Sequence, residues 1–274
     1  MHQRLWIAYN HTCIREFGIP SWYEYILAGD AEGLAHRFPQ GYEVGDILLT
    51  ERIIPLPKSV QNFLIKELCP DVWASPGAAC PCNNDLLVLP YLGRRLGSGD
   101  NSTVLSPHEF RLHLDQMESL GLPIKAYSER MAIALAFMHW AAHIDAGGVE
   151  FALAPTRGRV TPINLPTKLE SHGLWALNFG CCEHMSTDMN GVNQAARAFW
   201  SSAPFYPRPG KRDEKDKQLW ENFKRAYLEA SFCFIKRGDV SVGCLPQAVM
   251  SAIEAMAPSQ DDCGSEPVQV AESL

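Results

Sequence analysis

The sequence predicts a mixed α+β fold, and the alternation of short aliphatic runs with longer helical patterns is the main reason. The runs 86–92 and 149–153 are short and almost wholly apolar, as buried strands are. Between about residues 107 and 143, apolar side chains recur at helical spacing around Pro123, a residue suited to the first turn of a helix. With 274 residues, 46% of them hydrophobic, the chain can fill the core of one substantial domain or of two small ones.

The remaining elements follow from residue type and from stop signals. Residues 46–54 are rich in aliphatic and β-branched side chains and end at Pro55, which favours a strand. The helical pattern of 213–236 ends at Gly238, a common helix stop. Residues 258–274 are polar and acidic with few large apolar side chains, so we expect a disordered tail there. Further predicted elements are a strand at 174–179 and helices at 58–68, 187–200 and 246–256.

The charge balance excludes a broad basic surface. The chain has 24 Lys and Arg residues against 31 Asp and Glu residues, a net charge of -7, so we expect no DNA partner. No apolar run approaches the ~18 residues of a membrane-spanning helix, and the start MHQRLWIAYN lacks the layout of a signal peptide. Nine cysteines, an odd number, fit reduced thiols better than a disulfide framework. These observations favour a cytoplasmic protein without membrane contact.

The cysteines do not follow the spacing of a structural zinc site, which needs four ligands and usually supplies them as two close pairs. Cys80 and Cys82 are too close together for the usual pair, and Cys181 is adjacent to Cys182. No pair of histidines lies at a matching distance from either. The sequence therefore predicts no structural zinc.

A second arrangement of metal-ligating residue types occurs at the end of the long predicted helix. His139 and His143 lie four residues apart, and Asp145 follows. Two imidazoles and a carboxylate suit a metal, but the usual intervening Glu is missing, and histidines near a helix C-terminus are favoured by the dipole and by packing. We therefore predict no metal at this position either.

Asp145 and Glu150 are the candidate catalytic residues. They flank Ala-Gly-Gly-Val, a flexible turn that enters a predicted strand. One carboxylate can act as a base while the other orients the substrate or donates a proton. In the alternative interpretation, Asp145 only ends the helix region and Glu150 is a solvent-facing strand residue. The sequence leaves both interpretations open.

The segment Leu177-Asn178-Phe179-Gly180 is similar to the Asp-Phe-Gly element that holds magnesium in kinases. Asn178 stands where that element has its carboxylate, and an amide is a poorer ligand for a hard cation. The chain also has no G-x-G-x-x-G phosphate loop. We therefore expect weak nucleotide binding or none.

Seven short segments together carry a resemblance to a known family: Glu51 to Pro57, Tyr91 to Arg95, His113 to Met117, Met131 to Trp140, Asp145 to Phe151, Trp175 to Phe179 and Pro204 to Pro209. Over about residues 40 to 235 the chain resembles a fungal family catalogued as a "zinc finger protein" domain of unknown function. The resemblance implies a remote relative of the protein-kinase fold, with a kinase-like large helical lobe and a reduced small lobe. The implied division is 1–95 for the small lobe and a hinge-like segment, 96–257 for the mainly helical lobe, and 258–274 for the tail.

The family that the chain resembles also includes fungal arginine-containing cyclodipeptide synthases, which make a diketopiperazine from arginine and a second amino acid delivered on tRNA. This resemblance implies an enzyme of secondary metabolism that forms amide bonds, needs no cofactor and has aminoacyl-tRNA as its partner. Asp145 and Glu150 are the closest match to the acidic motif of those synthases, although glycines occupy the positions between them. The alternative function is a catalytically inactive kinase-like binding or regulatory module. The residues expected to bind the small amino-acid-derived substrate are Tyr91, Arg94, Arg95, His139 and Asn178.

Overall fold

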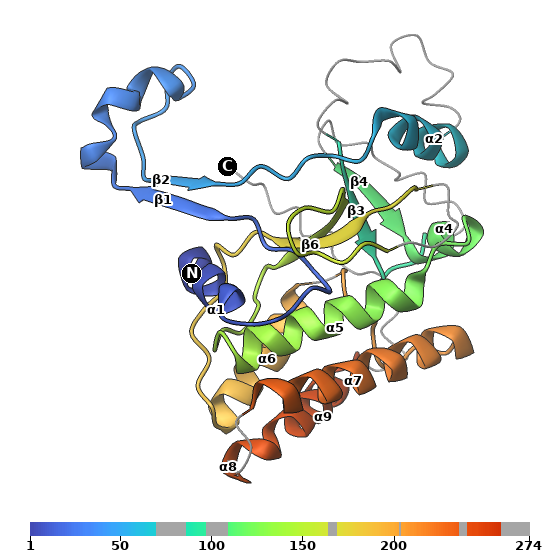
Figure 1. Ribbon diagram of the computed structural model, residues 1–274. Coiled ribbons are helices and arrows are strands. Elements are labelled where there is room, and N and C mark those ends of the chain that lie inside the picture. The colour runs from blue at the N-terminus through green and yellow to red at the C-terminus, as the bar shows by residue number, and fades with distance from the viewer. Residues whose placement is uncertain (70–85, 97–108, 164–168, 203, 236–239, 259–274) are drawn as a thin grey trace.

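The computed structural model of the protein describes residues 1–69, 86–96, 109–163, 169–202, 204–235 and 240–258 (Figure 1). Within these ranges the chain has a four-stranded sheet, a two-stranded sheet and several helices. The α+β prediction is therefore confirmed. Of the predicted tail, all but residue 258 lies outside the described ranges. No helix in the described part of the chain is long and apolar enough to cross a membrane.

The four-stranded sheet is built from β3 (Leu87–Tyr91), β4 (Glu109–His113), β5 (Glu150–Ala154) and β6 (Gly173–Leu177). The strand order is β4-β3-β5-β6, with β3 and β4 parallel and the other neighbours antiparallel. Opposed residues of paired strands share a face, and on one face Val88, Phe110, Phe151 and Leu174 are at most 1% exposed. The ring of Phe151 on this face contacts that of Tyr206, which stacks on Phe199 of the helix at 189–201, so this face lies toward the helices.

The helices form a second layer below the sheet (Figure 1). The helix α5 (Ile124–Trp140) lies between the sheet and α7 (Glu214–Phe234), and α6 (Met189–Ser201) packs on α9 (Leu245–Ala255). Because α5 has neighbours on both sides, its buried side chains are spread around the helix instead of forming one stripe. Two short helices are α4 (Leu114–Ser119), which follows β4, and α8 (Val240–Gly243), which precedes α9.

The N-terminal residues supply the remaining elements, and the helices 2–10 and 58–68 contribute to the same hydrophobic core. These elements are α1 (His2–Asn10), β1 (Trp22–Ile26), the 3-10 helices Ala28–Asp30 and Glu32–Arg37, β2 (Ile47–Thr50) and α2 (Lys58–Leu68). The strands β1 and β2 form an antiparallel ribbon that extends away from the four-stranded sheet (Figure 1). The segment before β1 reaches the outer edge of β6, because the backbone of Gly18 bonds to Leu174 and Ala176. A side chain at Gly18 would meet the Trp175 ring at 2.7 Å, so glycine allows this close approach.

One sequence prediction was wrong in type. The helix expected over 107–143 begins as a strand, β4, which is followed by the separate helices α4 and α5. Phe110 and Leu112 are buried while Arg111 between them is exposed, and this alternation fits a strand beside β3. Gly121, with φ of 63°, then ends α4 just before Pro123 precedes α5.

The other predicted elements are confirmed within a few residues. The helix α2 has the predicted bounds, and β3, β5, β6, α6, α7 and α9 lie close to theirs. The predicted strand 46–54 is shorter, since β2 ends at Thr50. The elements α1 and β1 were not predicted. In the four-stranded sheet, β3 and β4 are neighbours. They come from opposite sides of residue 95, the boundary between the two lobes that the family resemblance implies.

Candidate functional site

Backbone strain is concentrated at two loops that flank the β5–β6 hairpin. Among the described residues, the non-glycine residues with positive φ are His143, Ala146, Glu170 and Asn178. His143 and Ala146, with φ of 54° and 59°, lie in the loop before β5, and Asn178, with φ of 62°, directly follows β6. Such conformations are sparsely populated for residues with side chains, and in proteins they cluster at functional sites.

The loop before β5 passes very close to the segment that follows β6. A side chain at Gly147 would meet the carbonyl oxygen of Cys181 at 3.1 Å, and one at Gly148 would meet the Cys181 Cβ at 2.9 Å. Gly148 also has φ of 71°, which glycine adopts without strain. The Gly-Gly pair between the two candidate carboxylates therefore lets these two loops touch.

Asp145 holds this loop arrangement together. Its Oδ1 accepts hydrogen bonds from the backbone N–H groups of Gly147 (3.1 Å) and Glu183 (2.9 Å), and its Oδ2 accepts one from the amide of Gln194 (2.9 Å). Asp145 is only 6% exposed. Its carboxylate thus joins the loop, the segment after β6 and α6.

Glu150 lies on the other side of the turn, at the first position of β5. Its Oε1 accepts a hydrogen bond of 3.1 Å from Nδ2 of Asn178. Partial burial raises the pKa of Glu150, the Asn178 hydrogen bond lowers it, and the charges of Glu109 and Arg111 act on it in opposite directions. Glu150 shares none of the hydrogen-bond partners of Asp145.

Tyr91 lies at the end of β3, close enough to Glu150 for the Glu150 charge to act on its hydroxyl. The antiparallel register of β3 and β5, continued from the Val88 and Leu153 pair, places Tyr91 opposite Glu150. Its ring contacts those of His113 and Phe205 edge-on, with centroids 5.7 and 5.0 Å away. Burial raises the pKa of Tyr91 to about 12, so the phenol stays protonated at neutral pH.

The charged residues around Tyr91 come from two strands and a loop. Glu109 and Arg111 lie on the same face of β4 as His113, the register partner of Tyr91, and their side chains approach each other to 3.5 Å. Arg94 follows β3, is exposed, and also acts electrostatically on the Tyr91 hydroxyl. We define the Glu150 site by these residues: Tyr91, Arg94, Glu109, Arg111, Glu150 and Asn178.

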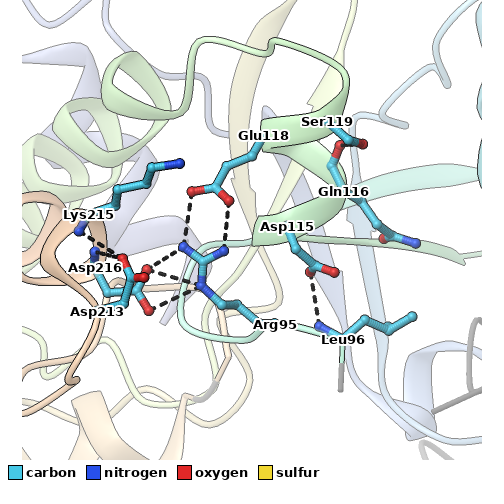
Figure 2. Close-up of polar contacts among 9 residues, drawn as sticks. All are labelled: Arg95, Leu96, Asp115, Gln116, Glu118, Ser119, Asp213, Lys215 and Asp216. Atoms are coloured by element: carbon cyan, nitrogen blue, oxygen red, sulfur yellow. Dashed lines mark hydrogen bonds and ion pairs between the residues drawn. The ribbon is translucent and has the colours of Figure 1, made fainter. Parts of the chain in front are cut away.

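Arg95 is directed away from this group, into an ion-pair cluster shown in Figure 2. Its guanidinium donates to both carboxylate oxygens of Glu118 on α4, at 2.7 and 3.0 Å, and to Asp216 in the first turn of α7. The neighbouring backbone N–H of Leu96 donates to Asp115 at 2.9 Å. Arg95, expected from the sequence to bind substrate, therefore connects β3 to two helices in this structure.

His139, also expected to bind substrate, lies in the interior. It is 0% exposed, and its Nδ1 lies 2.8 Å from the hydroxyl of Tyr227, which also accepts a hydrogen bond from Trp140. Burial lowers the pKa of His139 to about 4, so its imidazole is neutral at pH 7. In this position His139 packs α5 against α7 and does not line the Glu150 site.

The described residues do not bring three His, Cys, Asp or Glu side chains together as metal ligands. Cys181 is exposed and Cys182 is buried, and burial raises the pKa of Cys182 to about 12, so its thiol is protonated at neutral pH. Cys80 and Cys82 lie outside the described residues.

The comparison with protein families gives one partial match. Residues 174–239 match a family described as "Zinc finger protein". This stretch contains Asn178, α6 and α7, but not Asp145, Glu150 or Tyr91. The comparisons with curated proteins and with solved structures gave no match. The geometry of the site therefore carries the functional argument.

Sequence reasoning missed Glu109, Arg111 and Gln194. The first two were hidden because their segment was interpreted as helical, although its alternation of polar and apolar residues was a signal for a strand. Gln194 had no local signal, since it meets Asp145 from a position 49 residues away.

Proposed function

We propose that the protein is an enzyme similar to arginine-containing cyclodipeptide synthases, forming amide bonds from aminoacyl-tRNA in fungal secondary metabolism. The observation that carries the proposal is the position of Glu150. Its partly buried carboxylate accepts a hydrogen bond from Asn178 and lies beside Tyr91, where β5 begins and β6 ends. A carboxylate in such surroundings suits recognition of a guanidinium or an amine, and its raised pKa makes it a better proton acceptor.

The chemistry requires positioning more than activation. The amine of one aminoacyl group attacks the ester carbonyl of another, a C–N bond forms, and the C–O bond to the tRNA ribose breaks. The free amine of the resulting dipeptidyl ester then attacks its own ester carbonyl in the same way, which closes the diketopiperazine ring and releases the second tRNA. In our proposal Glu150 accepts the proton that the amine loses, and the ribose oxygen leaves as a hydroxyl after it gains a proton. The ester already supplies the driving force, so the reaction needs no ATP and no cofactor. The protein accelerates it by holding the amine close to the ester carbonyl.

The arrangement of elements supports a distant relation to kinases as part of the same proposal. A long helix, α5, is followed by the strained loop with Asp145, the hairpin β5–β6 and then Asn178-Phe179-Gly180. In the kinase-like interpretation the two-stranded ribbon belongs to the reduced small lobe. The net charge of -7 leaves contact with tRNA to local basic residues such as Arg94.

The second candidate is a catalytically inactive binding module, and a specific observation favours it. Both oxygens of Asp145 are occupied by partners that hold the loops together, which leaves Glu150 as the one candidate carboxylate whose chemistry is available. A single carboxylate with neighbouring donors is sufficient to bind a cationic ligand without transforming it.

Expression with a complete tRNA and synthetase mixture, followed by mass spectrometry of the small molecules, tests the proposal. We expect an arginine-containing diketopiperazine that disappears in the Glu150→Gln variant. Absence of any such product with charged arginyl-tRNA present would contradict the enzyme proposal. In that case, calorimetry with free arginine, compared between the chain and Glu150→Gln, tests the binding module.

A further inference from the structure

The ribbon of β1 and β2 is a sheet without a covered face. We call residues 22–50 the acidic ribbon, which consists of the two strands and the 3-10 helices between them. It extends away from the body of the molecule in Figure 1. Two strands alone are marginal in water, and sheets usually gain stability from further strands or from packing on a helix.

Large apolar side chains on the acidic ribbon face solvent. Tyr23 and Tyr25 on β1 are 56% and 53% exposed, and Leu48 and Leu49 on β2 are 49% and 48% exposed. Tyr25 is the register partner of Leu48, whereas Leu49 pairs with Glu24 and lies on the opposite face. Both faces of the ribbon therefore expose apolar surface, and adjacent exposed apolar residues of this size mark interaction sites.

One edge of the ribbon is open. The helix α1 lies beside β1, and β2 lies on the far side of β1 from α1 (Figure 1). In the described part of the chain, β2 has β1 as its one strand partner. Its outer backbone N–H and C=O groups can therefore pair with an added strand, which is the usual function or hazard of an exposed edge.

The charge of the acidic ribbon indicates which kind of partner would bind it. Residues 22–50 contain five carboxylates, Glu24, Asp30, Glu32, Glu43 and Asp46, and one guanidinium, Arg37. All six of these residues are exposed. A second copy of the chain would bring the same excess of negative charge to the contact, so like charges oppose pairing between copies. A basic segment is attracted instead.

We propose that the outer edge of β2 binds an extended segment of another protein whose side chains alternate between aliphatic residues and Lys or Arg. The segment adds a third strand to the ribbon by main-chain hydrogen bonds. Its aliphatic side chains cover Leu48 on the face that Leu48 shares with Tyr25, and its basic side chains lie on the opposite face, which carries Leu49 and Glu24. This interaction is independent of the Glu150 site and of the reaction proposed for it.

Two synthetic peptides test this proposal with the full chain. One is the basic strand Lys-Val-Thr-Ile-Lys-Val-Thr-Val-Lys, and the other has Glu in place of every Lys. We expect the basic peptide to bind in fluorescence anisotropy, to bind more weakly in higher salt, and to slow hydrogen exchange of residues 47–50. The acidic peptide should bind at least about tenfold more weakly.

A double variant, Leu48→Thr with Leu49→Thr, removes the apolar surface and keeps residues that favour strands. It should weaken binding of the basic peptide about tenfold. Phe232→Ala, which removes a 61% exposed aromatic from α7, is the matched control and should leave binding unchanged. Equal binding of both peptides, equal binding to the double variant, or no binding of the basic peptide would overturn the proposal. Sedimentation showing a dimer that the double variant disrupts would replace the partner with a second copy.

Discussion

Asn178 Nδ2 donates a hydrogen bond to Glu150 Oε1 over 3.1 Å, and this contact joins the residue after β6 to the first residue of β5. The left-handed backbone of Asn178, with φ of 62°, aims its amide toward the neighbouring strand. Asn is one of the few residues with a side chain that adopts this conformation readily. The Glu150 side chain is therefore held by β5 at its backbone and by Asn178 at its carboxylate.

Substituting the two candidate carboxylates should separate function from stability. Glu150→Gln keeps an oxygen that can accept from Asn178 and removes a partly buried charge, so we expect the free energy of unfolding not to fall. We expect its product formation to fall at least about 100-fold, the usual contribution of a positioned acid or base. Mass spectrometry and urea denaturation measure the two effects.

Asp145→Asn is the matched comparison. Its new NH₂ group would face the Gln194 amide, a donor that now has Asp145 Oδ2 as an acceptor. We expect the free energy of unfolding to fall by about 1–3 kcal/mol, the cost of an unsatisfied buried polar group. An unchanged stability for Asp145→Asn, or unchanged product for Glu150→Gln, would contradict the roles assigned here.

Stability should depend on pH through Glu150. Burial is the largest influence on its pKa, which is raised in the folded chain. The folded state therefore holds the proton more tightly than the unfolded chain, and the contribution of Glu150 to stability is full below its unfolded pKa. It is lost as pH rises through the raised folded pKa. Urea denaturation across this pH window should show that the free energy of unfolding falls more steeply with pH for the wild type than for Glu150→Gln. Parallel plots of this free energy against pH would contradict the assignment.

The sequence placed Glu150 and Asn178 correctly at strand ends, because short apolar runs bounded by turn residues define strands locally. It suggested a shared site for Asp145 and Glu150 because they flank a flexible turn that enters a strand. Two glycines between them let the backbone turn tightly against Cys181, so the carboxylates have different neighbours. The partners of Asp145 and Arg95 come from α6 and α7, far along the chain, and no local pattern encodes such contacts.

Zinc should be absent as a stoichiometric component, in spite of the description of the matched family. Structural zinc needs four ligands in tetrahedral geometry, and the cysteine spacing of this chain does not supply them. Metal analysis of protein purified under reducing conditions should find well below one zinc per chain, and a chelator should leave the melting temperature unchanged. About one zinc per chain together with unfolding by the chelator would refute this prediction.

Nucleotide binding should be weak. Asn178 offers an amide where magnesium binding favours a carboxylate, and that amide already donates to Glu150. ATP with magnesium should therefore leave the melting temperature unchanged at sub-millimolar concentration, as followed by thermal shift. Asn178→Asp places a second carboxylate beside Glu150 and is the variant in which magnesium-dependent stabilisation is expected. A clear stabilisation of the wild type would instead support a nucleotide site.

The ion-pair cluster of Arg95 should be a stabilising connection between β3 and the helical layer. Its two partners are partly buried, with side-chain exposures of 28% for Glu118 and 12% for Asp216. Arg95→Met removes the guanidinium and leaves both carboxylates without it, so we expect the free energy of unfolding to fall by about 2 kcal/mol. Arg95→Lys retains the charge but cannot bond both carboxylates side by side, and should restore less than half of that loss.

Two measurements distinguish this role from a general charge effect. Lys217, whose partner Glu214 is 86% exposed, is the matched control, and Lys217→Ala should change stability by less than about 0.5 kcal/mol. The hydrogen bond from Arg95 is also the main cause of a lowered pKa at Glu118. The stability that the lowered Glu118 pKa contributes is present above the pKa of the unfolded chain and is lost as pH falls through the lowered folded pKa. The difference in free energy of unfolding between the wild type and Arg95→Met should therefore shrink on acidification. A difference that persists at low pH, or equal effects of Arg95→Met and Lys217→Ala, would show that Arg95 does not hold these helices and would return it to the residues available for substrate.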